Sequence, residues 1–216
     1  MEKNVLMIST NAFPNGDAGA VRDLSFAQIY QELGYTVFHI GQGKEKSHGS
    51  FEQVDYFSLY TPASNIWQQL VRYISYRKRL FRAIKMIEEK YGKPTVIHLY
   101  DSPYGGIKKI KKYASRINAK LIHDSVEWYS SCEFAKGRWD KSYILKDRLN
   151  RKLIDTSFRV IGISSYLRNY FESKGIKSIR IPVIIDTAAG VSQPIHMWNK
   201  INLVYAGSPA KKDLLG

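Results

Sequence analysis

Val5-Leu6-Met7-Ile8 is the first of two apolar runs that bracket a helical pattern near the start of the chain. The second run is Tyr35-Thr36-Val37-Phe38-His39-Ile40, and Gly34 stands just before it as a helix stop. Between the runs, residues 11–19 are rich in Asn, Pro and Gly, and apolar residues then recur at helical spacing at Val21, Leu24, Phe26, Ala27, Ile29, Tyr30 and Leu33. This order predicts a βαβ unit with parallel strands and a right-handed crossover.

The same alternation continues along the chain. We expect further strands at 54–59, 94–99, 120–123, 158–163 and 178–183, and helices at 64–91, 106–117, 141–153 and 164–175. Strands that alternate with helices predict an α/β fold with a Rossmann-like, doubly wound parallel sheet. Such sheets bind ligands at the carboxyl ends of their strands, so function is expected in the loops that follow strands.

The periodicity is lost near the end of the sequence. Residues 186–200 collect Gly190, Ser192, Gln193 and Pro194, as interdomain linkers do, and a new apolar run follows at 201–205. We therefore expect residues 1–185 to form one Rossmann-like domain, 186–200 to be a linker, and 201–216 to begin a second, incomplete domain.

Charge indicates an anionic partner. Among the 216 residues, 33 Lys and Arg outnumber 19 Asp and Glu, which gives a formal net charge of +14. A broad positive field of this kind attracts nucleic acid, anionic lipid headgroups or phosphorylated small molecules, and the total charge does not choose among them.

Cysteine content and apolar runs indicate the compartment. Cys132 is the single cysteine, so an intrachain disulfide is excluded and a reducing compartment such as the cytoplasm is expected. The run Val5-Leu6-Met7-Ile8 is too short for a signal peptide or a membrane span, and no other stretch of the sequence is long and apolar enough to span.

The first strand-to-helix loop is one candidate binding element. Gly16, Asp17 and Gly19 stand at the entrance to a helix, where backbone N–H groups and the helix dipole favour an anion or a polar sugar group. The loop matches neither GxGxxG nor a Walker sequence. The alternative is an ordinary strand-to-helix turn capped by Asp17.

A second candidate follows the strand expected at 120–123. His123, Asp124 and Glu127 would stand at its carboxyl end, where a histidine could contact substrate hydroxyls or stabilise charge and Glu127 could orient it. The alternative is a capped turn in which Asp124 accepts from backbone amides. His98 and Asp101 repeat the pattern, less clearly, at the end of the preceding strand.

Two classes of site are disfavoured. One cysteine and five scattered histidines form neither a Cys-x-x-Cys nor a His-x-x-x-His pair, so no metal site is expected. Ser164 and Ser165 follow Gly162-Ile163 without a Gly-x-Ser-x-Gly nucleophile elbow, which argues against a Ser-His-Asp hydrolase.

The helix expected at 64–91 mixes cations with aromatic residues. Its candidate membrane-surface residues are Trp67, Arg72, Arg77, Lys78, Arg79 and Arg82. This mixture is typical of helices that lie on a membrane surface. The alternatives are a packed amphipathic helix with a solvated charged face, or stacking on single-stranded nucleic acid; the sequence contains no RNP-like motif or zinc finger.

Four segments, taken in order, resemble glycosyltransferases of the GT-B fold and the family 4, retaining type. They are Phe13 to Arg22, similar to that family's glycine-containing loop; Leu121 to Glu127, similar to its histidine-bearing strand; Val160 to Leu167 with Ile181 to Asp186, similar to the segments before its linker; and Leu203 to Asp213, similar to the start of its C-terminal domain. The resemblance identifies the chain as the N-terminal, acceptor-side half of such an enzyme.

The resemblance also implies roles for individual residues. Gly19 would approach donor phosphate or sugar, His123 would hydrogen-bond the transferred sugar, and Asp124 and Glu127 would shape the pocket. Arg22 and Ser164 fall on substrate-binding segments. In the second domain, Lys211 or Lys212 would contact the donor diphosphate, with Ser208 where many relatives have an arginine.

The implied function is transfer of a sugar from a nucleotide-sugar donor to a polysaccharide or lipid-linked acceptor. The family's enzymes are longer than this chain, and their paired-glutamate motif has no counterpart here, so the chain alone is expected to be inactive. The resemblance implies no cofactor besides the donor substrate and no nucleic acid partner, with a cytoplasmic location that includes peripheral contact with the inner membrane face. The alternative is a non-catalytic Rossmann-like module that binds nucleotide, nucleic acid or an anionic membrane.

Overall fold

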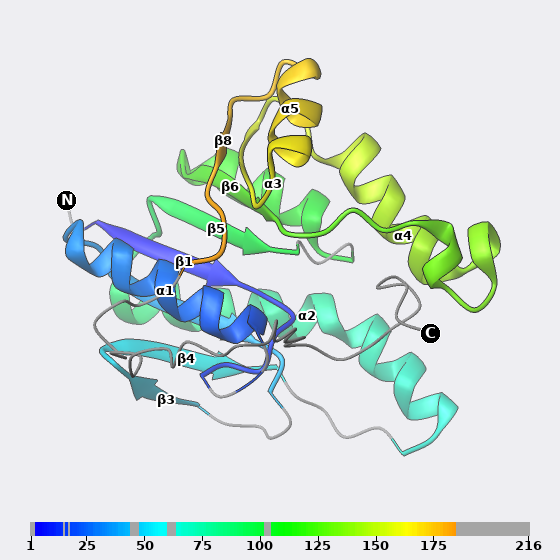
Figure 1. Cartoon of the computed structure of the whole chain (residues 1–216). Helices are drawn as coiled ribbons and strands as arrows, with labels where there is room; N and C mark the ends of the chain where they lie inside the picture. The colour runs from blue at the N-terminus through cyan, green and yellow to red at the C-terminus, as the bar shows by residue number, and fades with distance from the viewer. Residues whose placement is uncertain are drawn as a thin grey trace, which may run out of the picture.

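The computed structural model describes residues 3–14, 16, 18–43, 48–59, 64–101 and 105–184. They form an eight-stranded sheet with the strand order β3-β4-β2-β1-β5-β6-β7-β8 (Figure 1). Neighbouring strands pair in parallel, except for the antiparallel pair β3 and β4 at one edge. The predicted α/β class with a Rossmann-like, doubly wound sheet is confirmed.

The strands are short, and the central ones are buried on both faces. They are β1 Asn4–Ile8, β2 Thr36–Gly41, β3 His48–Phe51, β4 Val54–Ser58, β5 Val96–Tyr100, β6 Lys120–Ser125, β7 Phe158–Gly162 and β8 Ser178–Arg180. Every residue of β1 is buried, which explains its continuous apolar sequence, since a central parallel strand has no solvent face.

In the described part of the chain, five α-helices connect the strands. They are α1 Ala18–Glu32, α2 Ile66–Tyr91, α3 Ile107–Ile117, α4 Lys141–Arg148 and α5 Ser165–Ser173. Side-chain caps start three of them: Asn65 accepts from the Gln68 amide, Asp140 from the Ser142 amide and Ser164 from the Leu167 amide. These caps satisfy N–H groups that the first turn leaves without partners, so each helix begins where its capping residue stands.

The helices divide unequally between the faces of the sheet. One apolar cluster includes Leu80, Ile84, Ile110 and Phe171, so α2, α3 and α5 pack on one face. The cluster on the other face receives Phe26, Ala27 and partly buried residues from α1, together with the partly buried Ile181 and Ile184 of the segment after β8. Among the described helices, α1 alone contributes buried residues to this second cluster.

Several boundaries differ from expectation. β3 was missed because His48-Gly49-Ser50-Phe51 lacks an apolar alternation. The strand expected at 120–123 continues to Ser125, and the helix expected at 141–153 ends at Arg148 and passes into a π-helical turn, Leu149–Leu153. β8 ends at Arg180, because the next two carbonyls bond to Arg22 rather than to a neighbouring strand.

The domain division stays a prediction. Residues 3–184, with the gaps given above, are consistent with one Rossmann-like unit up to residue 185. The linker expected at 186–200 and the second domain expected from 201 lie outside the described residues.

Candidate functional site

The candidate site is the edge of the sheet where the parallel strands present their carboxyl ends. The order of the strands reverses beside β1, which leads through α1 to β2 on one side and has β5 as its neighbour on the other. Loops at such a switch point flank a crevice that binds ligands in open α/β folds. The loops after β1, β5, β6 and β7 bring Asn11, Asp101, Glu127 and Ser164 to this edge.

Gly16 and Gly19 allow the loop after β1 to close against α1. A Cβ on Gly16 would lie 2.3 Å from the Ala12 carbonyl oxygen, and a Cβ on Gly19 would lie 2.5 Å from Nδ2 of Asn11. Both distances are too short for a side chain, so these close approaches are made within the protein. Substrate contact by the two glycines stays a prediction, and Asp17 lies outside the described residues.

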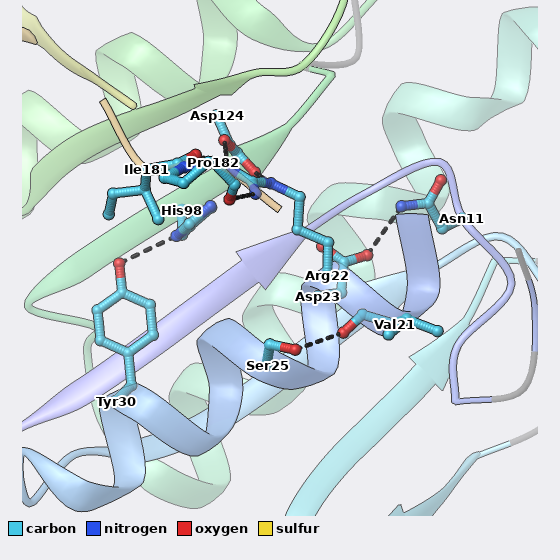
Figure 2. Close-up of polar contacts among 10 residues, drawn as sticks. All are labelled: Asn11, Val21, Arg22, Asp23, Ser25, Tyr30, His98, Asp124, Ile181 and Pro182. Atoms are coloured by element: carbon cyan, nitrogen blue, oxygen red, sulfur yellow. Dashed lines mark hydrogen bonds and ion pairs between the residues drawn. The ribbon is translucent and has the colours of Figure 1, made fainter. Parts of the chain in front are cut away.

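A buried polar cluster lies beneath this loop. Nδ2 of Asn11 donates to Oδ2 of Asp23 at 3.0 Å, as Figure 2 shows, and Nε2 of His39 lies 3.2 Å from the same oxygen. The ring of Phe13 stacks on His39 with centroids 4.2 Å apart. The sequence pattern did not predict this cluster; the available signal was an acid among the apolar residues of α1 and a lone histidine in an apolar strand.

Arg22 and Asp124 form an ion pair in the interior. Nε and Nη2 of Arg22 donate to the two carboxylate oxygens of Asp124 at 2.7 and 2.9 Å. Nη1 donates to the Pro182 carbonyl at 2.7 Å, and Nη2 also donates to the Ile181 carbonyl at 3.1 Å (Figure 2). Arg22 is 7% exposed and Asp124 is fully buried. The structure therefore joins two residues that were predicted separately, one as substrate-binding and one as catalytic.

This ion pair determines how Asp124 can act. Burial raises the pKa of the Asp124 carboxyl, and the two hydrogen bonds from Arg22 act in the opposite direction. Because both carboxylate oxygens already accept from Arg22, the geometry suits Asp124 to fixing the end of β6 in place. The catalytic role predicted for it stays a prediction.

His123 lies within β6 and is buried. The sequence placed His123 at the carboxyl end of a strand at 120–123, but β6 continues to Ser125, so His123 and Asp124 both lie within the strand. Its ring makes an edge contact with Phe171, with centroids 6.0 Å apart. Burial lowers the pKa of His123 to about 4, so its imidazole is neutral near neutral pH.

His98 is the corresponding buried histidine on the face that α1 covers. The hydroxyl of Tyr30 lies 3.0 Å from its Nδ1 (Figure 2), and Phe26 packs on its ring with centroids 4.9 Å apart. Burial lowers the pKa of His98 to about 4. Like His123, it is a neutral interior group near neutral pH.

The part-exposed polar groups at the carboxyl edge form a second cluster, which we call the edge cluster: Asp101, Glu127, Tyr129 and Lys146. Nζ of Lys146 lies 2.8 Å from Oδ2 of Asp101 and 3.9 Å from the centroid of the Tyr129 ring. Burial and a hydrogen bond to Glu127 raise the pKa of Tyr129, so the phenol keeps its proton and donates. Asp101 has a φ of 39°, an uncommon conformation for a residue other than glycine.

The edge cluster contains two predicted residues and two missed ones. Asp101 and Glu127 were expected at this edge. Lys146 belongs to α4, which is distant in sequence, and Tyr129 was not singled out, although an aromatic residue just after a strand end was an available signal. Because these side chains remain partly open, they are the described groups best placed to meet a polar ligand.

Other predicted residues have structural partners or lie elsewhere. Ser164 caps α5, which leaves substrate contact there a prediction. Within the described ranges, no three His, Cys, Asp or Glu side chains converge as metal ligands would. Ser208, Lys211 and Lys212 lie outside the described residues.

The first half of α2 exposes both apolar and basic side chains. Ile66 is 82% and Trp67 is 76% exposed, and Val71 and Ile74 are also exposed. Four of the predicted surface cations of α2 are exposed as well: Arg72, Arg77 and Lys78 in this half, and Arg82 beyond it. Arg79 differs, because its guanidinium bonds to the carbonyls of Leu59 and Arg72 and burial lowers its pKa.

Figure 1 shows the start of α2 extending away from the sheet, which explains why side chains around that part of the helix are open. In the described part of the chain, no helix combines the length and apolarity that crossing a bilayer requires.

Comparison with known proteins finds similarity in structure. The sequence matches no protein-family model and no curated protein. A UDP-glucose:anthocyanidin 3-O-glucosyltransferase in complex with UDP aligns with 90% of this chain at 11% identity and a TM-score of 0.56. Sucrose-phosphate synthase from Thermosynechococcus elongatus aligns with 84% of it at 14% identity and a TM-score of 0.57. The catalytic domain of starch synthase IV from Arabidopsis thaliana, bound to ADP and acarbose, aligns with 88% of it at 15% identity and a TM-score of 0.51.

The likeness establishes the fold. This chain spans about half the length of these neighbours, namely 55%, 48% and 53% of the respective chains. The described residues thus share the Rossmann-like fold found within glycosyltransferases, as the sequence resemblance implied.

Replacement of Arg22 tests the interior ion pair. Arg22→Met would leave the Asp124 carboxylate buried without a counter-charge, which costs about 3–5 kcal/mol of unfolding free energy. The double variant Arg22→Met, Asp124→Leu should recover part of that loss, because the buried charge is gone. Urea unfolding of the wild type, both single variants and the double variant measures this. If the losses of unfolding free energy in the two single variants simply added up in the double variant, the two side chains would not be coupled and the prediction would be wrong.

Two of the buried histidines, His98 and His123, predict acid sensitivity. Their pKa values are about 4 in the folded chain, against 6.5 when unfolded, so between these pH values the unfolded state binds more protons and the free energy of unfolding falls as the pH falls. As the pH falls through this window, each histidine lowers the free energy of unfolding by about 3 kcal/mol. His98→Phe and His123→Phe should each flatten the plot of unfolding free energy against pH, measured by urea titration. Slopes equal to that of the wild type would refute this.

Proposed function

We propose that this chain supplies the acceptor-binding half of a glycosyltransferase that uses a nucleotide-sugar donor. The observation that carries the proposal is the similarity of fold to three enzymes: a glucosyltransferase, a sucrose-phosphate synthase and a starch synthase. Each of these matches covers 84–90% of this chain. Two of those structures hold UDP or ADP. The edge cluster gives the fold a polar, part-open site where such sheets bind ligands.

In this proposal the edge cluster binds the acceptor. The Asp101 and Glu127 carboxylates accept hydrogen bonds from acceptor hydroxyls, and Lys146 and Tyr129 hold the two carboxylates in place. His123 and Asp124 are buried, so we assign them to positioning β6, from whose end Glu127 is presented. Gly16, Gly19 and Ser164 shape the loops that face the donor.

The donor side of the reaction rests on the sequence resemblance. Lys211 or Lys212, with Ser208 nearby in sequence, would offset the negative charge that develops on the departing diphosphate. Family 4 membership and retention of configuration belong to the same proposal. Because the aligned glycosyltransferases are about twice as long, we further propose that donor binding requires chain beyond these 216 residues.

Nucleotide-sugar binding tests the proposal. Calorimetry would compare the 216-residue chain with a longer protein in which a donor-binding domain follows it, using UDP- and ADP-sugars and the free nucleotides. We expect the longer protein to bind one base and sugar tightly and the shorter chain to bind none. Failure of both to bind any nucleotide sugar would overturn the proposal, and salt-sensitive binding of oligonucleotides instead would favour a binding module.

We also propose that the acceptor is a lipid-linked or polysaccharide intermediate and that α2 rests on the inner face of an anionic membrane. Trp67 and its exposed apolar neighbours would enter the headgroup region, and Arg77, Lys78 and Arg82 would meet lipid phosphates. This arrangement would bring the acceptor to a protein that lies on the cytoplasmic side.

Liposome co-sedimentation tests membrane contact. Arg77→Glu, Lys78→Glu, Arg82→Glu should abolish binding to vesicles that contain phosphatidylglycerol, because each basic residue contributes about 1 kcal/mol at an anionic surface. A matched control reverses three exposed cations of α3, Lys108, Lys112 and Arg116, on a helix without an exposed apolar stretch. Equal loss in both variants would indicate general charge attraction and exclude a specific role for α2.

A further inference from the structure

Three basic residues gather at the opposite edge of the sheet, where β6, β7 and β8 begin. Lys120 is the first residue of β6, Arg159 is the second residue of β7, and Lys177 directly precedes β8. With Thr156, Ser157 and adjoining backbone they line a surface cavity of about 420 Å³. The candidate site lies at the carboxyl ends of the same strands, so this cavity, the amino-edge pocket, is separate from it.

The cations of β6 and β7 extend from the same face of the sheet. Successive side chains of a strand alternate between faces, so residues two apart share a face. Lys120 stands two residues before Ile122, and Arg159 stands two residues before Ile161. Both isoleucines belong to the apolar cluster on the α1 face, so both cations are on that face as well.

The third cation stands beside Arg159. Val160 is in register with Ser178, and its amide donates to the Lys177 carbonyl at 2.9 Å. The preceding residues, Arg159 and Lys177, are therefore neighbours on adjacent parallel strands. Like charges directly opposite each other on a sheet repel, so this arrangement is unfavourable without a counter-charge.

No side chain among the described residues supplies that counter-charge. Lys120, Arg159 and Lys177 make no ion pair with any described residue, and the described lining of the pocket contains neither Asp nor Glu. Asp155 precedes Thr156, and its carboxylate already accepts from Lys111 and from the amide and hydroxyl of Ser157. The pocket is thus a hollow with three exposed cations and an uncompensated positive charge.

We propose that the amino-edge pocket binds a small molecule that carries a phosphate or diphosphate group with at least two negative charges. The Arg159 guanidinium offers the planar fork that phosphate oxygens accept in pairs, and the two lysines add point charges on either side. Nucleic acid fits less well, because a phosphate backbone needs an extended basic stripe rather than a single hollow. The site stands independently of the glycosyltransferase proposal, since it uses different residues at a different edge.

The probe is inorganic pyrophosphate, titrated into the intact chain by calorimetry. Lys120→Gln, Arg159→Gln, Lys177→Gln removes the three cations from exposed positions at strand ends. The matched control, Lys108→Gln, Lys112→Gln, Lys136→Gln, removes three other exposed lysines and the same total charge. Circular dichroism and urea unfolding verify that both variants fold.

We expect the pocket variant to lose pyrophosphate affinity by about tenfold or more and the control to keep it, with binding that weakens as salt rises. Pyrophosphate held at the carboxyl edge would be retained by the pocket variant, so that result overturns the amino-edge site. Equal loss in the two variants would also overturn it, as would absence of binding. If the pocket variant instead lost binding of single-stranded oligonucleotides and kept pyrophosphate binding, the result would overturn the small-molecule proposal and indicate that the pocket binds nucleic acid.

Discussion

The Arg22–Asp124 ion pair holds together parts of the fold that would otherwise meet only through apolar packing. It joins α1 to the carboxyl end of β6, and the same guanidinium donates hydrogen bonds to the carbonyls of Ile181 and Pro182 after β8. An ion pair in the interior is costly to assemble and more costly to break, so its geometry is strictly maintained once formed. The loop after β1 leads into α1 and the loop after β6 starts at the end of that strand, so two of the loops around the candidate site adjoin elements that this pair joins.

The two faces of the sheet are stabilised differently. The face covered by α2, α3 and α5 is mainly an aliphatic cluster. The α1 face contains a polar layer of Arg22, Asp23, His39, His98 and Asp124 within apolar surroundings. Buried polar groups must find hydrogen-bond partners, and these are specific in direction, so α1 is held in one orientation where apolar packing alone would allow several.

The fold class followed from the sequence because apolar runs and helical periods alternate plainly. Boundaries failed where a local pattern was absent, as in β3, or where a distant side chain intervened, as Arg22 does after β8. The candidate site was only partly predictable. Asp101 and Glu127 follow strands and could be found by position, whereas Lys146 reaches the same edge from α4 through tertiary packing. Burial of His123 depended on α5, since Phe171 covers its ring.

β8 is a three-residue strand at the edge of the sheet, and an edge strand that short would open easily under tension. Immediately after it, the carbonyls of Ile181 and Pro182 accept hydrogen bonds from the guanidinium of Arg22, which is buried and paired with Asp124. A pull on the chain from beyond residue 184 would therefore act on α1 and β6 through Arg22, as well as on β7 through the bond from the Ile181 amide to the Gly162 carbonyl. Residues 181 and 182 are thus tied to α1, β6 and β7 at once, so a force on the chain that follows is shared among these elements and does not fall on β8 alone.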